Sequence, residues 1–230
     1  HSLGCKVNSY ETQAMQKMME SAGYEIVPFG EEIADIYIIN TCSVTNIADR
    51  KSRQMIHKAK KINPEAVVAA AGCYVESAGD NIDEDVDIVI GNNEKSHLIE
   101  ILNEYFEHMD KEKSVDIGKA TGFDELNIDS PLEHTRAYVK IQDGCNRFCS
   151  YCIIPYVRGR IRSRKPDDVM AEIKRVAASG CKEVVLTGIH LSSYGLDFKD
   201  STVKLIDVIE AVNRIEGIER IRLGSLEPLI

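Results

Sequence analysis

The stretch Cys145-Asn146-Arg147-Phe148-Cys149-Ser150-Tyr151-Cys152 places three thiols on one short loop, separated by three residues and then by two. A structural zinc site or an ordinary ferredoxin cluster takes four protein ligands, and the sequence offers no fourth cysteine close by. Three thiolates can bind three irons of a [4Fe–4S] cluster and leave the fourth iron open. The loop therefore predicts an iron–sulfur site at which chemistry can occur; a zinc site and a chance grouping are the alternatives.

The composition is that of a globular protein of one large domain or two smaller ones. Of 230 residues, 43% are hydrophobic and 28% charged. No run approaches the roughly 20 apolar residues that span a bilayer and no signal peptide opens the chain, so we expect no membrane contact and a cytoplasmic location. Seven cysteines, an odd number, argue against a disulfide framework and favour metal or catalytic use in a reducing compartment.

The formal net charge of −9 is unevenly distributed. Residues 1–115 carry 11 Lys/Arg and 20 Asp/Glu, whereas residues 116–230 carry 17 of each. Between Gly144 and Pro166 there is no acidic residue, and the six basic ones are Arg147, Arg158, Arg160, Arg162, Arg164 and Lys165. This local stripe predicts a phosphate-binding surface beside the cysteine loop. An ordinary solvated charged face is the alternative.

The first half of the chain alternates helix and strand signals. Asn8 and Glu11 have the spacing of a capping box for a helix that runs to about Ala22. Strands are expected near 24–28, 36–39, 66–71 and 86–90, and helices at 46–62 and 94–108. Short apolar strands between helices are typical of a parallel sheet covered on both faces. The prediction is an α/β fold whose N-terminal part is an open parallel sheet flanked by helices.

The second half resumes the same alternation after a polar stretch. Residues 1–112 are assigned to the first domain, 113–134 to a linker that carries Gly118, Gly122 and Pro131, and 135–230 to the second domain. In the second domain we expect strands at 136–142, 182–187 and 220–223 and helices at 167–179 and 203–215. The pattern is a (β/α) repeat that is cut short.

Three more cysteines follow predicted strands of the first domain. Cys5, Cys42 and Cys73 each come directly after a strand or strand end and beside a small or polar residue. Because ligands of open parallel sheets collect at the carboxyl ends of the strands, these thiols can converge and hold a second three-thiolate cluster. The alternative is that each packs as a small apolar side chain, which we expect of Cys181.

Several motifs resemble those of the methylthiotransferases, which are two-cluster radical S-adenosylmethionine (SAM) enzymes. They are Gly4-Cys5-Lys6-Val7-Asn8, Asn40-Thr41-Cys42-Ser43-Val44, Gly72-Cys73-Tyr74 and the 145–152 loop. The first motif, together with 187–195, looks like the branch that acts on threonylcarbamoyladenosine at position 37 of tRNA. The resemblance covers essentially the whole chain and implies that the second domain is the N-terminal part of a partial radical SAM (β/α) barrel.

The resemblance implies two [4Fe–4S] clusters and SAM as cofactors. Cys145, Cys149 and Cys152 would hold the cluster that binds and reductively cleaves SAM, and the resulting radical would remove the C2 hydrogen of the adenine. Cys5, Cys42 and Cys73 would hold an auxiliary cluster that carries the sulfur to be methylated and inserted. The implied partners are the tRNA anticodon loop and an external electron donor such as flavodoxin or ferredoxin.

Other residues receive expected roles through the resemblance and their positions, and none is assigned to catalysis beyond the cluster ligands. Tyr151 could pack on the adenine of SAM. Thr187 and Gly188, and Ser225 and Glu227, end predicted strands on the ligand-binding face of a barrel. Arg158, Arg160 and Arg164 could meet the tRNA backbone or the SAM carboxylate. His190 is expected to be a polar residue at the barrel edge.

The sequence is also compatible with functions other than methylthiolation of threonylcarbamoyladenosine. Within the family, the substrate could be isopentenyladenosine in tRNA or an aspartate of a ribosomal protein. Outside it, a two-cluster electron-transfer protein predicts four protein ligands per cluster, and a zinc-binding module predicts no iron. We expect the chain to be part of a longer protein, because the family continues into further barrel strands and a small RNA-binding domain. This chain alone should bind tRNA poorly.

Overall fold

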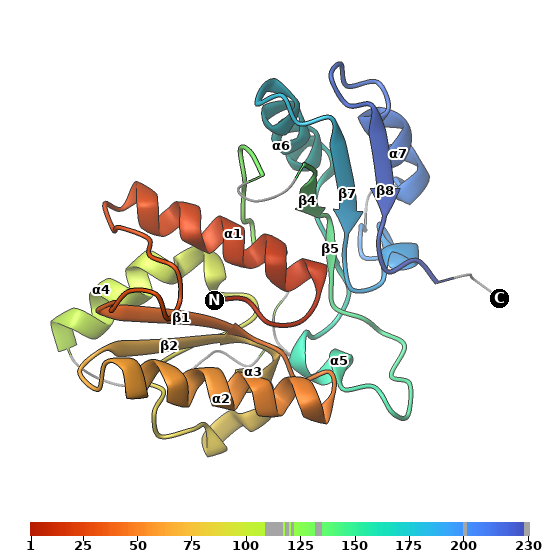
Figure 1. Ribbon diagram of the computed structural model, residues 1–230. Helices are drawn as coiled ribbons and strands as arrows, with labels where there is room; N and C mark the ends of the chain where they lie inside the picture. The colour runs from red at the N-terminus through yellow and green to blue at the C-terminus, as the bar shows by residue number, and fades with distance from the viewer. Residues whose placement is uncertain (109–116, 118–119, 121, 132–134, 200–201, 228–230) are drawn as a thin grey trace.

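The computed structural model describes residues 1–108, 117, 120, 122–131, 135–199 and 202–227. It contains two three-stranded parallel sheets, one in each half of the chain, and a short two-stranded antiparallel ribbon. Helices cover the sheets (Figure 1). The expected mixed α/β fold with parallel sheets flanked by helices is confirmed. No closed barrel is found in the described ranges.

The first sheet has the order β1-β2-β3, from β1 (Ile36–Thr41), β2 (Val67–Gly72) and β3 (Ile88–Ile90). Its two faces bury different helices. Met15 and Met19 of α1 (Lys6–Ser21) and Leu98 and Leu102 of α4 (Leu98–His108) pack on one face. The other face takes α2 (Asn46–Ile62), whose first turn is capped because the Thr45 side chain accepts a hydrogen bond from Ala48 N at 3.1 Å. Short α3 (Cys73–Ala78), η1 (Gly79–Asn81) and η2 (Lys95–His97) complete this half.

The second sheet has the order β4-β7-β8, from β4 (Ala137–Lys140), β7 (Glu183–Thr187) and β8 (Arg220–Leu223). Helices α6 (Pro166–Ala178) and α7 (Leu205–Val212) bury apolar side chains in the same core as these strands. The antiparallel ribbon pairs β5 (Gln142–Asp143) with β6 (Arg162–Ser163). Between its strands lie the cysteine loop and α5 (Ile154–Val157), and η4 (Leu191–Ser193) follows β7.

Helix α1 belongs to both halves. Tyr10 and Ala14 are buried in the core of the second sheet, whereas Met15 and Met19 are buried in the core of the first. Figure 1 shows α1 lying over the first sheet, on the side toward β4 and β5. A helix with one apolar face can pack on only one sheet. Because α1 buries two faces, it connects the two halves of the molecule.

Three local predictions are wrong. No strand forms at 24–28, because Pro28 has no N–H for a sheet ladder and Ile26 remains 40% exposed. Asn8 and Glu11 do not cap α1, since the helix begins at Lys6 with Cys5 as its N-cap residue. The strand expected at 136–142 divides at Ile141, where the chain exchanges its partner β7 for β6.

Part of the stretch predicted as a linker is packed. Leu126 and Ile128 are buried in the core of the second half, and Ile128 N donates to Glu172 Oε1 at 2.7 Å. Most of 109–121 and residues 132–134 lie outside the described residues. Among the described helices, none is long and apolar enough to cross a membrane.

Candidate metal centres

Two strands of the first sheet end side by side, and each is followed by a cysteine. The register pairs Thr41 with Gly72, so Cys42 and Cys73 leave neighbouring strands at the same edge. The segment before Cys5 joins them, because Leu3 N donates to Asn40 O at 2.9 Å and Asn8 Nδ2 donates to both Leu3 O and Thr41 O. The structure therefore brings together Cys5, Cys42 and Cys73, which we call the auxiliary trio.

Glycines make this convergence possible. Gly4 has φ +98, and a Cβ there would lie 2.7 Å from the Sγ of Cys42. Gly72 has φ +97, and a Cβ there would overlap the backbone oxygen of Thr41 and lie 2.9 Å from its nitrogen. These left-handed conformations and close approaches favour glycine. The glycine-cysteine pairs of the sequence thus fold as tight turns that deliver the thiols.

The environment of the auxiliary trio is unusual for free thiols. Cys42 and Cys73 are buried and Cys5 is exposed. Burial raises the pKa of the Cys42 thiol, and the neighbouring Cys73 and Cys5 thiolates raise it further. Burial also raises the pKa of Cys73, which Arg158 opposes. Because a metal displaces thiol protons when it binds, a cluster of thiols in which Cys42 and Cys73 resist ionisation suits a metal group better than isolated nucleophiles.

The spacing of the sulfur atoms bears on the kind of metal group. Sulfurs around one tetrahedral zinc ion lie roughly 3.8 Å apart, since each Zn–S bond is about 2.3 Å. In the described part of the chain, no three cysteine sulfurs lie within 4.8 Å of one another. As the thiols stand in the described residues, no three of them have the spacing of ligands around one zinc ion.

The loop trio, Cys145, Cys149 and Cys152, follows β5. Gly144, with φ +69, leads into it, and a Cβ there would overlap Arg160 O. Cys145 N donates to Gly159 O at 3.1 Å, and Cys152 N donates to Cys149 O at 2.9 Å. Phe148 adopts the left-handed φ of +48 and lies under the Arg160 guanidinium, 4.4 Å from ring centroid to Cζ.

The strand-end residues of the second sheet lie beside this loop. A Cβ on Gly188 would be 2.9 Å from both Gln142 O and Gln142 Oε1, so the end of β7 contacts the strand that enters the loop. Glu227 Oε2 lies 2.6 Å from His190 Nε2 and 3.8 Å from Arg147 Nε. Thr187 is buried, and Ser225 has φ +58 and accepts from Leu191 N. Tyr151, in contrast, is 92% exposed.

Comparison with known proteins agrees with this arrangement. The UPF0004 model, described as an uncharacterised protein family, matches residues 1–91, and the radical SAM superfamily matches residues 139–230. The threonylcarbamoyladenosine tRNA methylthiotransferase MtaB of Bacillus subtilis is 43% identical over 99% of this chain and 51% of its own length. The chain belongs to the radical SAM methylthiotransferase family. It spans about half the length of the curated relatives it matches.

A second branch and a solved structure are more distant. The tRNA-2-methylthio-N(6)-dimethylallyladenosine synthase of Moorella thermoacetica is 36% identical over 98% of this chain and 52% of its own length. The structure of the radical SAM methyltransferase TsrM from Kitasatospora setae, with tryptophan and a SAM analogue bound, superposes with a TM-score of 0.57. It covers 94% of this chain and 56% of TsrM at 13% identity, which supports the fold alone.

The predicted basic surface beside the loop is wrong for most of its arginines. Arg158, Arg162 and Arg164 are all buried. Arg164 pairs with Glu172, and Arg158 and Arg162 pair with Asp143. Only Arg147, Arg160 and Lys165 of the stripe are exposed. The guanidinium groups of Arg158 and Arg164 are therefore not available to a tRNA backbone in this structure.

The carboxylates that pair with these buried cations were not predicted from the sequence. Glu11, interpreted as a capping residue, contacts Lys95, Lys140 and Arg158 with no side-chain exposure. A signal was present in Lys140, a lysine within the strand expected at 136–142, because a buried lysine requires a carboxylate partner.

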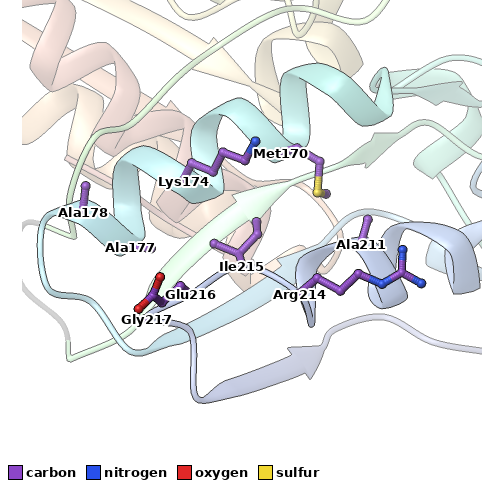
Figure 2. Close-up of a pocket in the computed structure, with 9 residues that line it drawn as sticks. All are labelled: Met170, Lys174, Ala177, Ala178, Ala211, Arg214, Ile215, Glu216 and Gly217. Carbon is purple, nitrogen blue, oxygen red and sulfur yellow. The ribbon is translucent and has the colours of Figure 1, made fainter.

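A hollow in the second half lies away from both trios. It has a volume of about 640 Å³ between α6 and the segment that joins α7 to β8, and is lined by Met170, Lys174, Ala177, Ala178, Ala211, Arg214, Ile215, Glu216 and Gly217. Figure 2 shows these residues on the two helices and the turn that precedes β8. This turn is at the amino end of β8, whereas ligands of such sheets bind at the carboxyl ends. We therefore do not place the reaction there.

Proposed function

We propose that the protein containing this chain is a radical SAM methylthiotransferase that converts N6-threonylcarbamoyladenosine in the tRNA anticodon loop to its 2-methylthio derivative. The observation that carries the proposal is the pair of three-cysteine groups, one at the carboxyl ends of strands in the first parallel sheet and one on the loop that follows β5. Three ligands per group leave a metal position open to a reactant, which an electron-transfer protein would not need.

The residues divide into two sites. Cys145, Cys149 and Cys152 would hold the cluster that binds SAM, and Cys5, Cys42 and Cys73 would hold the auxiliary cluster. Bound there, two [4Fe–4S] clusters supply the electron for reductive cleavage of SAM and the sulfur for insertion. The protein binds, orients and shields these groups. Burial of Cys145, Cys42 and Cys73 limits access of water to the iron–thiolate bonds.

The ends of β7 and β8 would bind SAM. The candidate residues are Thr187, Gly188, Ser225 and Glu227. Gly188 lies against Gln142, and the half-exposed Glu227 has its carboxylate at His190 and 3.8 Å from Arg147 Nε. A carboxylate in this position can accept hydrogen bonds from SAM hydroxyl or amino groups. Tyr151 is free to cover the adenine, because its ring is almost fully exposed.

The substrate branch is proposed on sequence similarity. The Bacillus relative named for threonylcarbamoyladenosine is 43% identical and the Moorella relative named for dimethylallyladenosine 36%. The test uses the full protein, reconstituted anaerobically with iron and sulfide and incubated with SAM and dithionite. Anticodon stem-loops that carry one modification or the other are compared by mass spectrometry. We expect the methylthio product on the threonylcarbamoyl substrate; product on the dimethylallyl substrate alone would assign the protein to the other branch.

The physiological electron would come from an external donor such as flavodoxin or ferredoxin. Replacing dithionite by reduced flavodoxin should sustain 5′-deoxyadenosine formation from SAM. Absence of 5′-deoxyadenosine with either reductant, while iron analysis shows intact clusters, would contradict the radical mechanism itself.

A further inference from the structure

A buried ionic network lies between the two halves of the molecule. At its centre Glu11 of α1 accepts from Lys95 Nζ at 2.6 Å, Lys140 Nζ at 2.8 Å and Arg158 Nη1 at 2.7 Å. Asp143 of β5 contacts Lys140 at 2.9 Å and Arg158 Nη1 at 3.1 Å. All five side chains are buried. Arg158, which directly follows α5, contacts both carboxylates. It therefore links Glu11 of α1 to Asp143 of β5.

The network reaches the auxiliary trio through two asparagines. Asn8 Oδ1 accepts from Arg158 Nη2 at 2.6 Å and lies 3.8 Å from Cys5 Sγ. Asn92 Nδ2 donates to Val157 O at 2.7 Å and lies 4.0 Å from Cys73 Sγ. The Lys95 ammonium donates to Asn92 Oδ1 as well as to Glu11. Each of these two thiols thus has a neighbour that is fixed by the network.

At its other end the network reaches the loop trio. Asp143 Oδ1 accepts from Gly144 N at 2.8 Å, and Gly144 immediately precedes Cys145. Gln142 Nε2 holds the same turn by donating to Asp143 O and Gly144 O. A continuous series of contacts therefore runs from the Cys73 thiol through Asn92, Lys95, Glu11, Arg158 and Asp143 to the residue before Cys145.

The network contains several cations, and carboxylates accompany them. Four cations contact Glu11 and Asp143, since Arg162 Nη2 lies 3.9 Å from Asp143. Asp124 also interacts with Lys140, and Glu76, which accepts from Asn92 N, interacts with Lys95 and Arg158. A buried cation is costly unless an anion accompanies it. The thiolates that an iron–sulfur cluster requires would add further negative charge beside Arg158.

Arg158 retains one donor for such an anion. Its two Nη atoms donate hydrogen bonds to Glu11, Asp143 and Asn8. Its Nε is buried and has no hydrogen-bond partner among the residues that the structure describes. The guanidinium lies close to the auxiliary trio, because Asn8 Oδ1, which accepts from Arg158 Nη2, is 3.8 Å from Cys5 Sγ. A donor without a protein acceptor beside three thiols fits a site whose acceptor sulfurs come from a bound cluster.

We propose that Arg158 is a positioning residue of the auxiliary site. Glu11 and Asp143 fix its guanidinium, so that the free Nε–H can donate a hydrogen bond to the sulfur atoms of a cluster held by Cys5, Cys42 and Cys73. Through Asp143 the same guanidinium fixes the turn before Cys145, which sets the separation of the two trios. The inference rests on the proposed function in so far as the auxiliary trio holds a cluster.

The test compares Arg158→Lys with Arg164→Lys in the full protein. Both arginines are fully buried and paired with carboxylates. The hydrogen-bond partners of Arg164 among the described residues include no cysteine; they are Tyr10, Glu125, Leu126, Asn127 and Glu172. Both variants are made in a background with Cys145→Ala, Cys149→Ala and Cys152→Ala, so that only the auxiliary trio can bind iron. After reconstitution, iron loss to a chelator and the midpoint potential of the cluster are measured.

Arg158→Lys keeps the charge but removes the Nε–H. We expect iron loss to become faster on the order of tenfold, as for other outer-shell partners of metal ligands. The midpoint potential should shift to more negative values, because a hydrogen bond to sulfur favours the reduced, more negative cluster. Arg164→Lys should leave both readouts unchanged. Equal behaviour of the two variants would overturn the assignment.

Two further outcomes are distinguishable. One is that Arg158→Lys lowers the melting temperature of the apoprotein more than Arg164→Lys does. In that case the iron loss of Asn92→Ala is measured, because this variant removes the contact with Cys73 without removing a charge. Iron loss that is unchanged in Asn92→Ala overturns the assignment. Failure of the background protein to bind iron overturns both the assignment and the proposed function. A stable cluster without 5′-deoxyadenosine in the unsubstituted protein contradicts the proposed function alone.

Discussion

Gly72 controls the turn by which β2 delivers Cys73 to the auxiliary trio. Its φ of +97 and the nearby backbone of Thr41 leave no room for a side chain. Gly180, at φ +90, has no atom within 4 Å of an added Cβ and serves as a matched control. Gly180→Ala should lower the free energy of unfolding by about 1 kcal/mol, the cost of the left-handed backbone. Gly72→Ala should cost several-fold more and reduce iron binding, as urea titration and iron analysis would reveal. Equal costs would mean that the turn tolerates a side chain.

Glu11 is the residue on which the buried network depends. Burial alone would raise the pKa of Glu11, but the three surrounding cations hold it well below its usual range. Glu11→Gln leaves these cations without their common partner and should cost about 3 to 5 kcal/mol in unfolding free energy at pH 7. Glu219→Gln, which breaks an exposed pair with Lys182, should leave the free energy of unfolding nearly unchanged, because solvent screens this pair.

The same depressed pKa gives the mutation a pH dependence. A carboxyl group whose folded pKa lies below its unfolded value contributes stability above the unfolded pKa, about 4.3, and loses it as the pH falls. The difference between wild type and Glu11→Gln should therefore be largest near neutral pH and shrink below about pH 4. Urea titrations of both proteins from pH 7 to pH 3 measure it. A difference that stays constant over this range would show that the Glu11 carboxyl is not ionised in the folded protein.

At the scale of elements, α1 joins the two sheets by burying two faces. Met15 is 1% exposed, within the first core. Met15→Ala should lower the free energy of unfolding by about 2 to 5 kcal/mol. Glu20→Ala, at an exposed position of the same helix, should change it by less than about 0.5 kcal/mol. Thermal and urea unfolding of the two variants provide the measurement, and a small effect of Met15→Ala would contradict the packing of α1 on the first sheet.

Elements with strong local signals could be predicted, and those set by distant contacts could not. Helix α2 and strand β8 have the predicted bounds, because apolar periodicity and flanking Asn63-Pro64 or glycine mark their ends in the sequence. The strand near 24–28 failed because a short apolar run has no ladder without a neighbouring strand. The convergence of Cys5, Cys42 and Cys73 could be predicted, since strand ends of a parallel sheet share one edge. The burial of Arg158 could not, because its partners Glu11 and Asp143 come from other elements.

At the scale of the whole molecule, the first sheet and the loop after β5 each present three cysteines, and a buried network connects the two groups. This arrangement suits a division of labour in which the loop trio initiates radical chemistry and the auxiliary trio holds the sulfur. Under the proposal for Arg158, the charges that are buried at the contact between the halves would hold the two sites at a fixed separation, although an apolar interface would be less costly.

The most direct test of this division of labour compares Cys149→Ala with Cys42→Ala in the reconstituted full protein. Each variant is incubated with SAM, dithionite and the threonylcarbamoyl-modified anticodon stem-loop, and mass spectrometry quantifies 5′-deoxyadenosine and the methylthio product. The account predicts that Cys149→Ala abolishes both, whereas Cys42→Ala still forms 5′-deoxyadenosine but no methylthio product. Methylthio product from Cys42→Ala, or 5′-deoxyadenosine from Cys149→Ala, would contradict it.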